Sequence, residues 1–173
     1  MITASEPDNE LVTIDSTHLK AHQDACRHGS DAEKQGFGKT KGGRNSKVNA
    51  VVNSAGKLLR MALMPGNRHE VTNAAEVLGD SLEGVVVLGD RGYVSEDLAW
   101  HILDHGGWPN IAPRSDIKEP LPYLKELGKL RHVVENFFCR IKRSRRVATR
   151  YDRLGVTYMS FVTLSAIDDW IRF

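Results

Sequence analysis

The segment Val85-Val86-Val87-Leu88-Gly89-Asp90-Arg91-Gly92-Tyr93 decides the fold class of this chain. Four large aliphatic residues in a row between two glycines predict a strand that is buried on both faces. An Asp that follows such a strand, ahead of a glycine turn, stands where α/β proteins place their chemistry, in the crevice beyond a strand end. Asp90 is therefore either a turn-forming residue that caps a loop or a functional carboxylate.

Two further carboxylates stand in comparable contexts. Asp15 directly follows a short β-branched run that predicts a strand, although Asp-Ser-Thr at 15–17 also suits a turn or a helix cap. Glu135 lies in a proline-free segment, residues 127–146, whose apolar residues recur at helical spacing. At about 100° per residue, Arg131 and Lys142 fall on the same arc as Glu135. The alternative for Glu135 is an ordinary i, i+4 ion pair with Arg131 on a solvated face, worth about 0.3–0.5 kcal/mol.

A convergence of the three carboxylates would require neutralisation of their charge. At about 5 Å and an effective dielectric near 20, each pair of ionised carboxylates repels by on the order of 3 kcal/mol. Protons or cations must neutralise such a cluster, and a set of oxygen ligands favours Mg²⁺ or Mn²⁺. Two such ions about 3.5–4 Å apart suit in-line attack on a phosphodiester. Asp15, Asp90 and Glu135 are thus the candidate catalytic residues and metal ligands.

The local charge pattern indicates a polyanionic partner. The whole chain carries a net charge of only +2, but positions 140–153 hold seven basic residues and one acid. A second basic stretch lies at 39–47. Clustered Arg and Lys beside a metal site favour a nucleic-acid backbone, whereas a charge run alone favours a solvated face. The candidate phosphate-binding residues outside the Glu135 helix arc are Lys47, Arg145, Arg146 and Arg150.

The order and content of these motifs resemble the catalytic domain of bacterial insertion-sequence DDE transposases, of the IS-five-like group. The resemblance rests on Ile14-Asp15-Ser16-Thr17, on Gly89-Asp90-Arg91-Gly92-Tyr93 and on the segment 131–142. Segments 47–52, 65–69 and 145–152 also match, so the resemblance covers about 11–173. It implies an RNase-H-like fold that cleaves DNA at element ends and joins the freed 3′-hydroxyl to a target.

The resemblance also implies roles for individual residues. Asp15, Asp90 and Glu135 would bind Mg²⁺ or Mn²⁺, as two ions. Arg131 and Lys142 occupy the Arg and Lys places of the family's signature around Glu135 and would position DNA near the metals. Gly128 stands at the Tyr place of that signature. Backbone contacts would come from Lys47, Arg145, Arg146 and Arg150.

Partners follow from the same resemblance. Family members usually carry a DNA-binding region ahead of the first Asp, and fourteen residues precede Asp15 here. We therefore expect a catalytic part that works with a separately encoded N-terminal DNA-binding part and as a homo-oligomer. Two alternatives stay open: an RNase-H-like nuclease that only hydrolyses, and a non-catalytic DNA-binding transposase remnant.

Length and composition indicate one globular domain, residues 1–173, with a flexible start at 1–10. The mean hydropathy is −0.37 and 40% of the residues are hydrophobic, with no stretch that predicts a membrane span or a signal peptide. Cys26 and Cys139 form no disulfide framework and suit a reducing cytoplasm. We expect a bacterial cytoplasmic protein associated with the nucleoid.

The pattern of elements predicts an α/β fold, an RNase-H-like mixed sheet flanked by helices. We expect strands at about 10–15, 46–53, 57–64, 84–89 and 109–113, with a hairpin turn at 53–56. We expect helices at about 70–80, 95–106, 127–146 and 156–172. The polar segment 18–43 predicts a mobile loop near the active site.

Two histidine pairs stand four residues apart, a spacing that can hold zinc on a helix. The pairs are His18 with His22 and His101 with His105. The sequence offers neither pair a third ligand, so it favours ordinary surface histidines over a zinc site.

Overall fold

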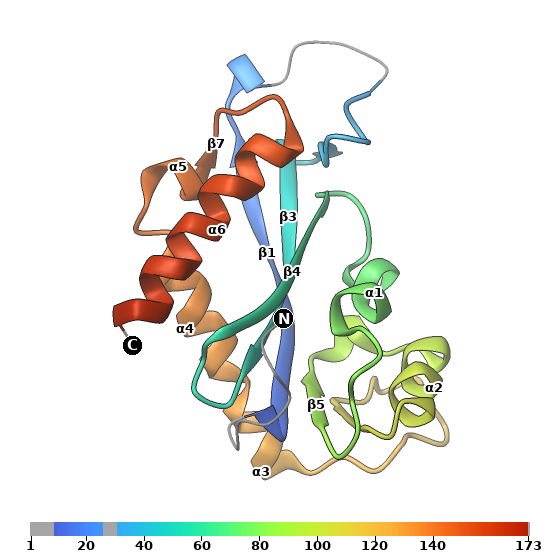
Figure 1. Cartoon of the computed structure of the whole chain (residues 1–173). Helices are drawn as coiled ribbons and strands as arrows, with labels where there is room; N and C mark the ends of the chain where they lie inside the picture. The colour runs from blue at the N-terminus through green and yellow to red at the C-terminus, as the bar shows by residue number, and fades with distance from the viewer. Residues whose placement is uncertain (1–8, 26–30, 173) are drawn as a thin grey trace.

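The computed structural model describes residues 9–25 and 31–172 and contains one mixed seven-stranded sheet (Figure 1). Its strands are β1 (Leu11–Ala21), β2 (Gly38–Thr40), β3 (Gly43–Asn53), β4 (Leu58–Pro65), β5 (Val86–Gly89), β6 (Trp108–Ile111) and β7 (Thr149–Arg150). The order along the sheet is β2-β3-β1-β5-β6, with β4 paired to β3 and β7 paired to β1. β3 runs antiparallel to β1, β2 and β4, whereas β5 and β7 run parallel to β1, and β6 runs parallel to β5.

Helices cover both faces of this sheet. On one side lie α1 (Ala74–Leu78) and α2 (Glu96–Asp104), and on the other lie α4 (His132–Ile141), α5 (Arg145–Ala148) and α6 (Gly155–Arg172) (Figure 1). Shorter elements connect them: α3 (Lys125–Gly128), η2 (Gln23–Ala25), η3 (Glu70–Asn73), η4 (Arg91–Tyr93) and η5 (Lys129–Arg131). The predicted α/β class, a mixed sheet flanked by helices as in RNase-H-like proteins, is confirmed. Among the described residues, no helix combines the length and apolarity that crossing a bilayer requires.

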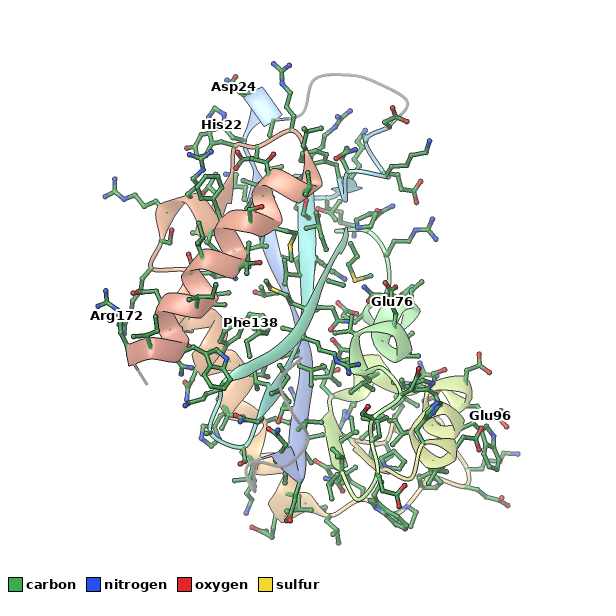
Figure 2. The ribbon with its side chains drawn as sticks, viewed as in Figure 1. His22, Asp24, Glu76, Glu96, Phe138 and Arg172 are labelled. Atoms are coloured by element: carbon green, nitrogen blue, oxygen red, sulfur yellow. The ribbon has the colours of Figure 1, made fainter. Side chains whose placement is uncertain are left out.

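Two apolar clusters bind the helices to the sheet. Successive β1 residues point to opposite faces, so Ile14 packs towards α1 and α2 while Leu19 packs towards α4 and α6. Phe138 of α4 belongs to the cluster with Leu19, and Figure 2 shows its side chain in that layer. The labelled Glu76 and Glu96 lie on the exposed surfaces of α1 and α2. The alternation places odd-numbered β1 residues, including Asp15, on the face that α4 covers.

The predicted loop at 18–43 is wrong over much of its length. β1 continues to Ala21 because its second half pairs with β3, down to Lys20 opposite Asn45, and because Leu19 is buried. Strand β2 and the start of β3 occupy the other end of the segment. Residues 26–30 of the predicted loop, with Cys26, lie outside the described residues, as do residues 1–8 of the predicted flexible start.

The predicted single helix at 127–146 is divided into α3, η5 and α4, with a turn at residues 142–144 before α5. A continuous helix would rotate Val147 by about 120° away from the buried stripe that contains Ile141. The turn instead places Val147 in the core, where its carbonyl accepts a hydrogen bond of 2.7 Å from the Tyr158 hydroxyl. Burial of Val147 and this hydrogen bond together favour the break.

Candidate active site

Asp15 and Asp90 lie at the point where β1 and β5 separate. The two strands pair in parallel with Thr13 opposite Leu88, and pairing ends there. Asp15 lies two residues after Thr13, and Asp90 lies two residues after Leu88. Because side chains alternate along an extended chain, this register directs both carboxylates to the same face of the sheet. Asp15 continues within β1, whereas Asp90 leaves the sheet and begins η4. The predicted pair of strand-end carboxylates is therefore brought together by one parallel register.

Each aspartate is oriented by a backbone N–H. Oδ1 of Asp15 accepts a 2.7 Å hydrogen bond from the Ser16 amide, and Oδ1 of Asp90 accepts a 2.7 Å bond from the Gly92 amide. A Cβ atom at Gly92 would lie 3.0 Å from that same Asp90 oxygen. The close approach explains why a glycine suits the second position after Asp90.

Burial and neighbouring charges shift the pKa of Asp15. Burial raises the pKa of Asp15 to about 6, against the opposing hydrogen bond from Ser16. The negative charges of Asp90 and Glu135 raise this pKa further, and the guanidinium of Arg131 lowers it. Glu135 comes from α4, which packs on β1, and its carboxylate is 61% exposed and 3.9 Å from Arg131. The charges of Asp90 and Glu135 thus both act on Asp15.

The donor set suits a hard divalent cation. The three carboxylates offer only oxygen atoms, and their mutual repulsion is relieved by positive charge. Among the residues that the structure describes, their ligand atoms do not form a group within 4.8 Å of one another. At least two of these carboxylates are therefore more than 4.8 Å apart in the structure.

The two basic residues predicted beside Glu135 border this centre. Nζ of Lys142 donates to Thr17 Oγ1 at 2.5 Å, on the β1 face that also carries Asp15, and burial lowers the pKa of Lys142. Arg131 is 23% exposed in its side chain. Within residues 9–25 and 31–172, its buried Nε has no hydrogen-bond partner. Arg131 thus adds positive charge at Asp15, and Lys142 contacts Thr17, two residues further along the same face of β1.

Of the other predicted DNA contacts, Arg145 and Arg146 lie on the surface. Arg146 stacks on the ring of Phe161 at 3.6 Å and forms a 2.8 Å ion pair with Asp152. The stacking holds the guanidinium of Arg146 against the protein and leaves about half of the side chain exposed. These two residues form an exposed basic surface on α5.

Lys47 and Arg150 are instead buried, which contradicts their prediction as phosphate contacts. The Lys47 side chain is 7% exposed, and its Nζ donates to Glu70 Oε1 at 2.6 Å and to the Arg68 carbonyl at 2.9 Å. Arg150 is fully buried. Neither side chain has a charged surface to offer to a DNA backbone, because each charge is used inside the fold.

Arg150 joins three segments of the chain. Its guanidinium donates to Ser46 Oγ at 2.7 Å, to the Asp152 carbonyl at 2.9 Å and to the Arg153 carbonyl at 3.1 Å. It also lies 3.7 Å from the ring centroid of Phe37. Arg150 is thus a structural residue within the basic stretch at 140–153.

Glu70 is a fourth carboxylate near this centre that the sequence did not indicate. Its Oε1 accepts hydrogen bonds from Lys47 and, at 3.3 Å, from Ser16 Oγ. Burial alone would raise the pKa of Glu70, but the hydrogen bond and charge of Lys47 lower it below its usual range. Glu70 thus remains an anion that holds the residue next to Asp15.

The same network reaches the turn after Asp90. Asn49 donates to the Glu70 carbonyl at 3.1 Å, and its Oδ1 accepts a 2.8 Å bond from the Tyr93 hydroxyl. Lys47 and Asn49 alternate along β3, so they share the face opposite to Asp15. That alternation of polar residues in a buried strand is the sequence signal that could have identified the network. The network contacts Ser16, next to Asp15, and Tyr93, in the turn after Asp90.

Gly128, at the Tyr place of the motif, packs against another tyrosine. A Cβ atom at Gly128 would lie 2.0 Å from the hydroxyl oxygen of Tyr123. Tyr123 therefore fills the space beside α3 that a side chain at position 128 would need.

Together, the mixed sheet, the two strand-end aspartates and the helix-borne glutamate define the class of RNase-H-like proteins with an acidic centre. A sequence model of the family described as "Transposase DDE domain" matches residues 6–164. The chain belongs to this family, whose members are enzymes of DNA transposition that use divalent metal ions and act on DNA. A putative transposase for insertion sequence element IS6501 from Brucella ovis is 31% identical over 134 residues, covering 73% of this chain and 98% of the relative.

Substitution of Asp15 by Asn is expected to stabilise the metal-free protein at neutral pH. Since the folded-state pKa of Asp15 lies above its ordinary value of 3.8, stability is lost as pH rises from about 4 to 6. Allowing for the partial exposure of the side chain, we expect a gain of about 1–2 kcal/mol at pH 7.5. Urea unfolding in EDTA at pH 4 and pH 7.5 measures it. An equal change at both pH values would contradict the shifted pKa.

Proposed function

We propose that Asp15, Asp90 and Glu135 are the catalytic residues of a DDE transposase of the IS-five-like group and hold two Mg²⁺ or Mn²⁺ ions. The observation that carries this proposal is the parallel register of β1 and β5, which brings Asp15 and Asp90 to the same end of one strand pair, beside the helix α4 that packs on β1 and bears Glu135. When bound, the metal ions lower the pKa of a water or a 3′-hydroxyl and neutralise charge on the scissile phosphate.

The remaining roles belong to basic side chains. Arg131 and Lys142 orient the scissile phosphate. The buried Nε of Arg131 lacks a hydrogen-bond partner among the described residues, and Nζ of Lys142 lies on the face of β1 that carries Asp15. Arg145 and Arg146, at the start of α5, bind the DNA backbone. Lys47 positions Glu70 and Ser16 and makes no DNA contact.

The proposed reaction also requires other copies of the chain and DNA. We propose that the chain, as one catalytic domain, assembles as a homo-oligomer on paired element ends, because transposition requires two ends to be cut together. The reaction takes place on nucleoid DNA in the bacterial cytoplasm.

A strand-joining assay tests this function against its alternatives. A labelled duplex that carries the terminal sequence of the element is incubated with supercoiled plasmid and Mg²⁺ or Mn²⁺, and the matched control duplex ends in a 3′-dideoxynucleotide. We expect label to enter the plasmid only from the 3′-hydroxyl duplex. Nicked plasmid without joined label would identify a hydrolytic nuclease, and DNA binding without any cleavage would identify a non-catalytic remnant.

A further inference from the structure

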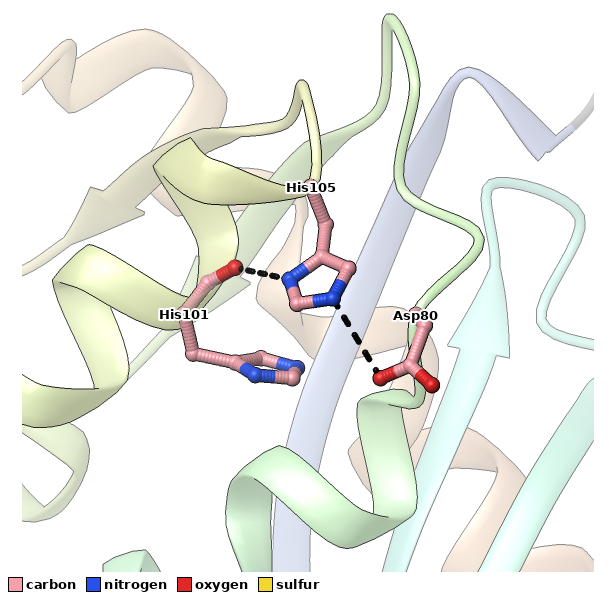
Figure 3. Close-up of side chains that lie close together, drawn as sticks. All are labelled: Asp80, His101 and His105. Carbon is pink, nitrogen blue, oxygen red and sulfur yellow. Dashed lines mark hydrogen bonds and ion pairs between the residues drawn. The ribbon is translucent and has the colours of Figure 1, made fainter.

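A second group of possible metal ligands lies away from the three carboxylates. Asp80, in the connection after α1, faces His101 of α2 and His105 at the end of α2 (Figure 3). One ligand atom from each of the three residues lies within 4.8 Å of the other two. Of the two histidine pairs in the sequence, this pair alone meets a third ligand within the described part of the chain.

The backbone brings Asp80 to α2. Helix α1 ends at Leu78, and Gly79 adopts a φ of +67°, a conformation that side-chain-bearing residues rarely adopt. The carbonyl of Gly79 lies 3.1 Å from Nε2 of His101. The turn at Gly79 therefore places both a carbonyl oxygen and the following carboxylate against the histidine face of α2.

The hydrogen bonds of His105 define its tautomer. Nδ1 of His105 lies 2.7 Å from the carbonyl oxygen of His101, which can only accept, so Nδ1 carries a proton. In the neutral ring, Nε2 then presents a lone pair, and it lies 3.5 Å from Asp80 Oδ1. Two acceptors that face each other require either a second proton on His105 or a cation between them.

One separation between the ligand atoms already fits a tetrahedral metal ion. With metal–nitrogen and metal–oxygen bonds of about 2.0–2.2 Å, tetrahedral ligand atoms stand about 3.3–3.5 Å apart. The separation between His105 Nε2 and Asp80 Oδ1 already has this value. A histidine whose Nδ1–H is anchored to a backbone carbonyl is also the common arrangement of a metal-binding imidazole.

We propose that Asp80, His101 and His105 bind a borderline divalent metal ion such as Zn²⁺, which joins the end of α2 to the α1–β5 connection. Two imidazoles and one carboxylate select Zn²⁺ or Co²⁺ over Mg²⁺. In the structure, Nε2 of His101 donates its proton to the Gly79 carbonyl. Binding of the ion therefore requires His101 to give up this hydrogen bond, carry its proton on Nδ1 and offer Nε2, and solvent takes the fourth position. The ion would stabilise the packing of α1 and α2 against β5, the strand that precedes Asp90.

Co²⁺ titration of the full chain in excess Mg²⁺ tests the site, because Mg²⁺ occupies oxygen-only centres and leaves imidazole ligands free. We expect visible absorption bands of tetrahedral Co²⁺ with one ion per chain, and at least about a tenfold loss of affinity in both His105→Gln and Asp80→Asn. His22→Gln, in the other histidine pair, is the matched control and should bind as wild type.

Thermal unfolding gives a second measurement. Saturating Zn²⁺ should raise the unfolding midpoint by roughly 3–6 °C in wild type and His22→Gln, and by less than about 1 °C in His105→Gln. Absence of Co²⁺ bands would overturn the proposal. So would equal Co²⁺ affinities, or equal Zn²⁺ shifts, in wild type and His105→Gln, and the contact between His105 and Asp80 would then be an ion pair only.

Discussion

Asp90→Asn is expected to reduce Mn²⁺-dependent nicking of supercoiled plasmid by at least about 10³-fold. In the proposed centre, an amide at this position keeps one oxygen but loses the negative charge that would hold a divalent ion beside Asp15. Loss of roughly 4 kcal/mol of transition-state stabilisation by the metal corresponds to this factor, since each 1.36 kcal/mol changes a rate tenfold. Initial rates of conversion from supercoiled to nicked plasmid measure the effect.

The substitution leaves the local structure in place. The side-chain amide oxygen of the Asp90→Asn variant can accept the same hydrogen bond from the Gly92 amide that Asp90 accepts at 2.7 Å. Asp104→Asn is a suitable control, because Asp104 is an exposed carboxylate at the end of α2. We expect nicking by this control at the wild-type rate. Metal-dependent nicking by Asp90→Asn within tenfold of wild type would remove Asp90 from the catalytic centre.

Arg150→Ala is expected to destabilise the protein by about 3–5 kcal/mol, the range seen when one partner of a buried charged network is removed. The change leaves Ser46 Oγ and the carbonyls of Asp152 and Arg153 without their donor. It also removes the guanidinium that packs on Phe37. The free energy of unfolding from urea denaturation, followed by circular dichroism, measures the loss.

Arg145→Ala is the matched control, since Arg145 is an exposed arginine in the same basic stretch. We expect its stability to change by less than about 0.5 kcal/mol. Its DNA affinity should fall and the salt dependence of binding should weaken by about one unit of slope, as for a lost phosphate contact. Unchanged stability of Arg150→Ala, together with weakened DNA binding, would instead place Arg150 on the DNA-binding surface.

The ion pair of Lys47 and Glu70 is the centre of a hydrogen-bond network that reaches residues near both aspartates of the strand-end site. Glu70 reaches the hydroxyl of Ser16, next to Asp15, while Asn49 joins the Glu70 carbonyl to Tyr93 in the turn after Asp90. Each aspartate is therefore flanked by a residue that the same network holds. Lys47 and Asn49 of the network lie on the face of the sheet opposite to the carboxylate of Asp15.

Five of the seven strands, the sheet class and the contexts of the three carboxylates could be predicted because their signals are local in the sequence. A buried aliphatic run before Asp90, a β-branched run before Asp15 and a helical stripe around Glu135 each depend on neighbouring residues only. The boundaries were less accurate. The second half of β1 and the break at residues 142–144 depend on pairing with β3 and on the burial of Val147, which are contacts distant in sequence.

The sequence by itself determined which residue types stand at strand ends and on the Glu135 helix, and hence the chemistry of the centre. Only the tertiary structure decided which charges are available to a substrate. Arg145 and Arg150 are the same residue five positions apart, yet one is exposed and the other is fully buried, because β7 pairs with β1 and carries Arg150 into the core. Asp80 likewise meets His101 and His105 only because the chain turns at Gly79. Burial and convergence arise from packing between distant segments, and no local pattern encodes them.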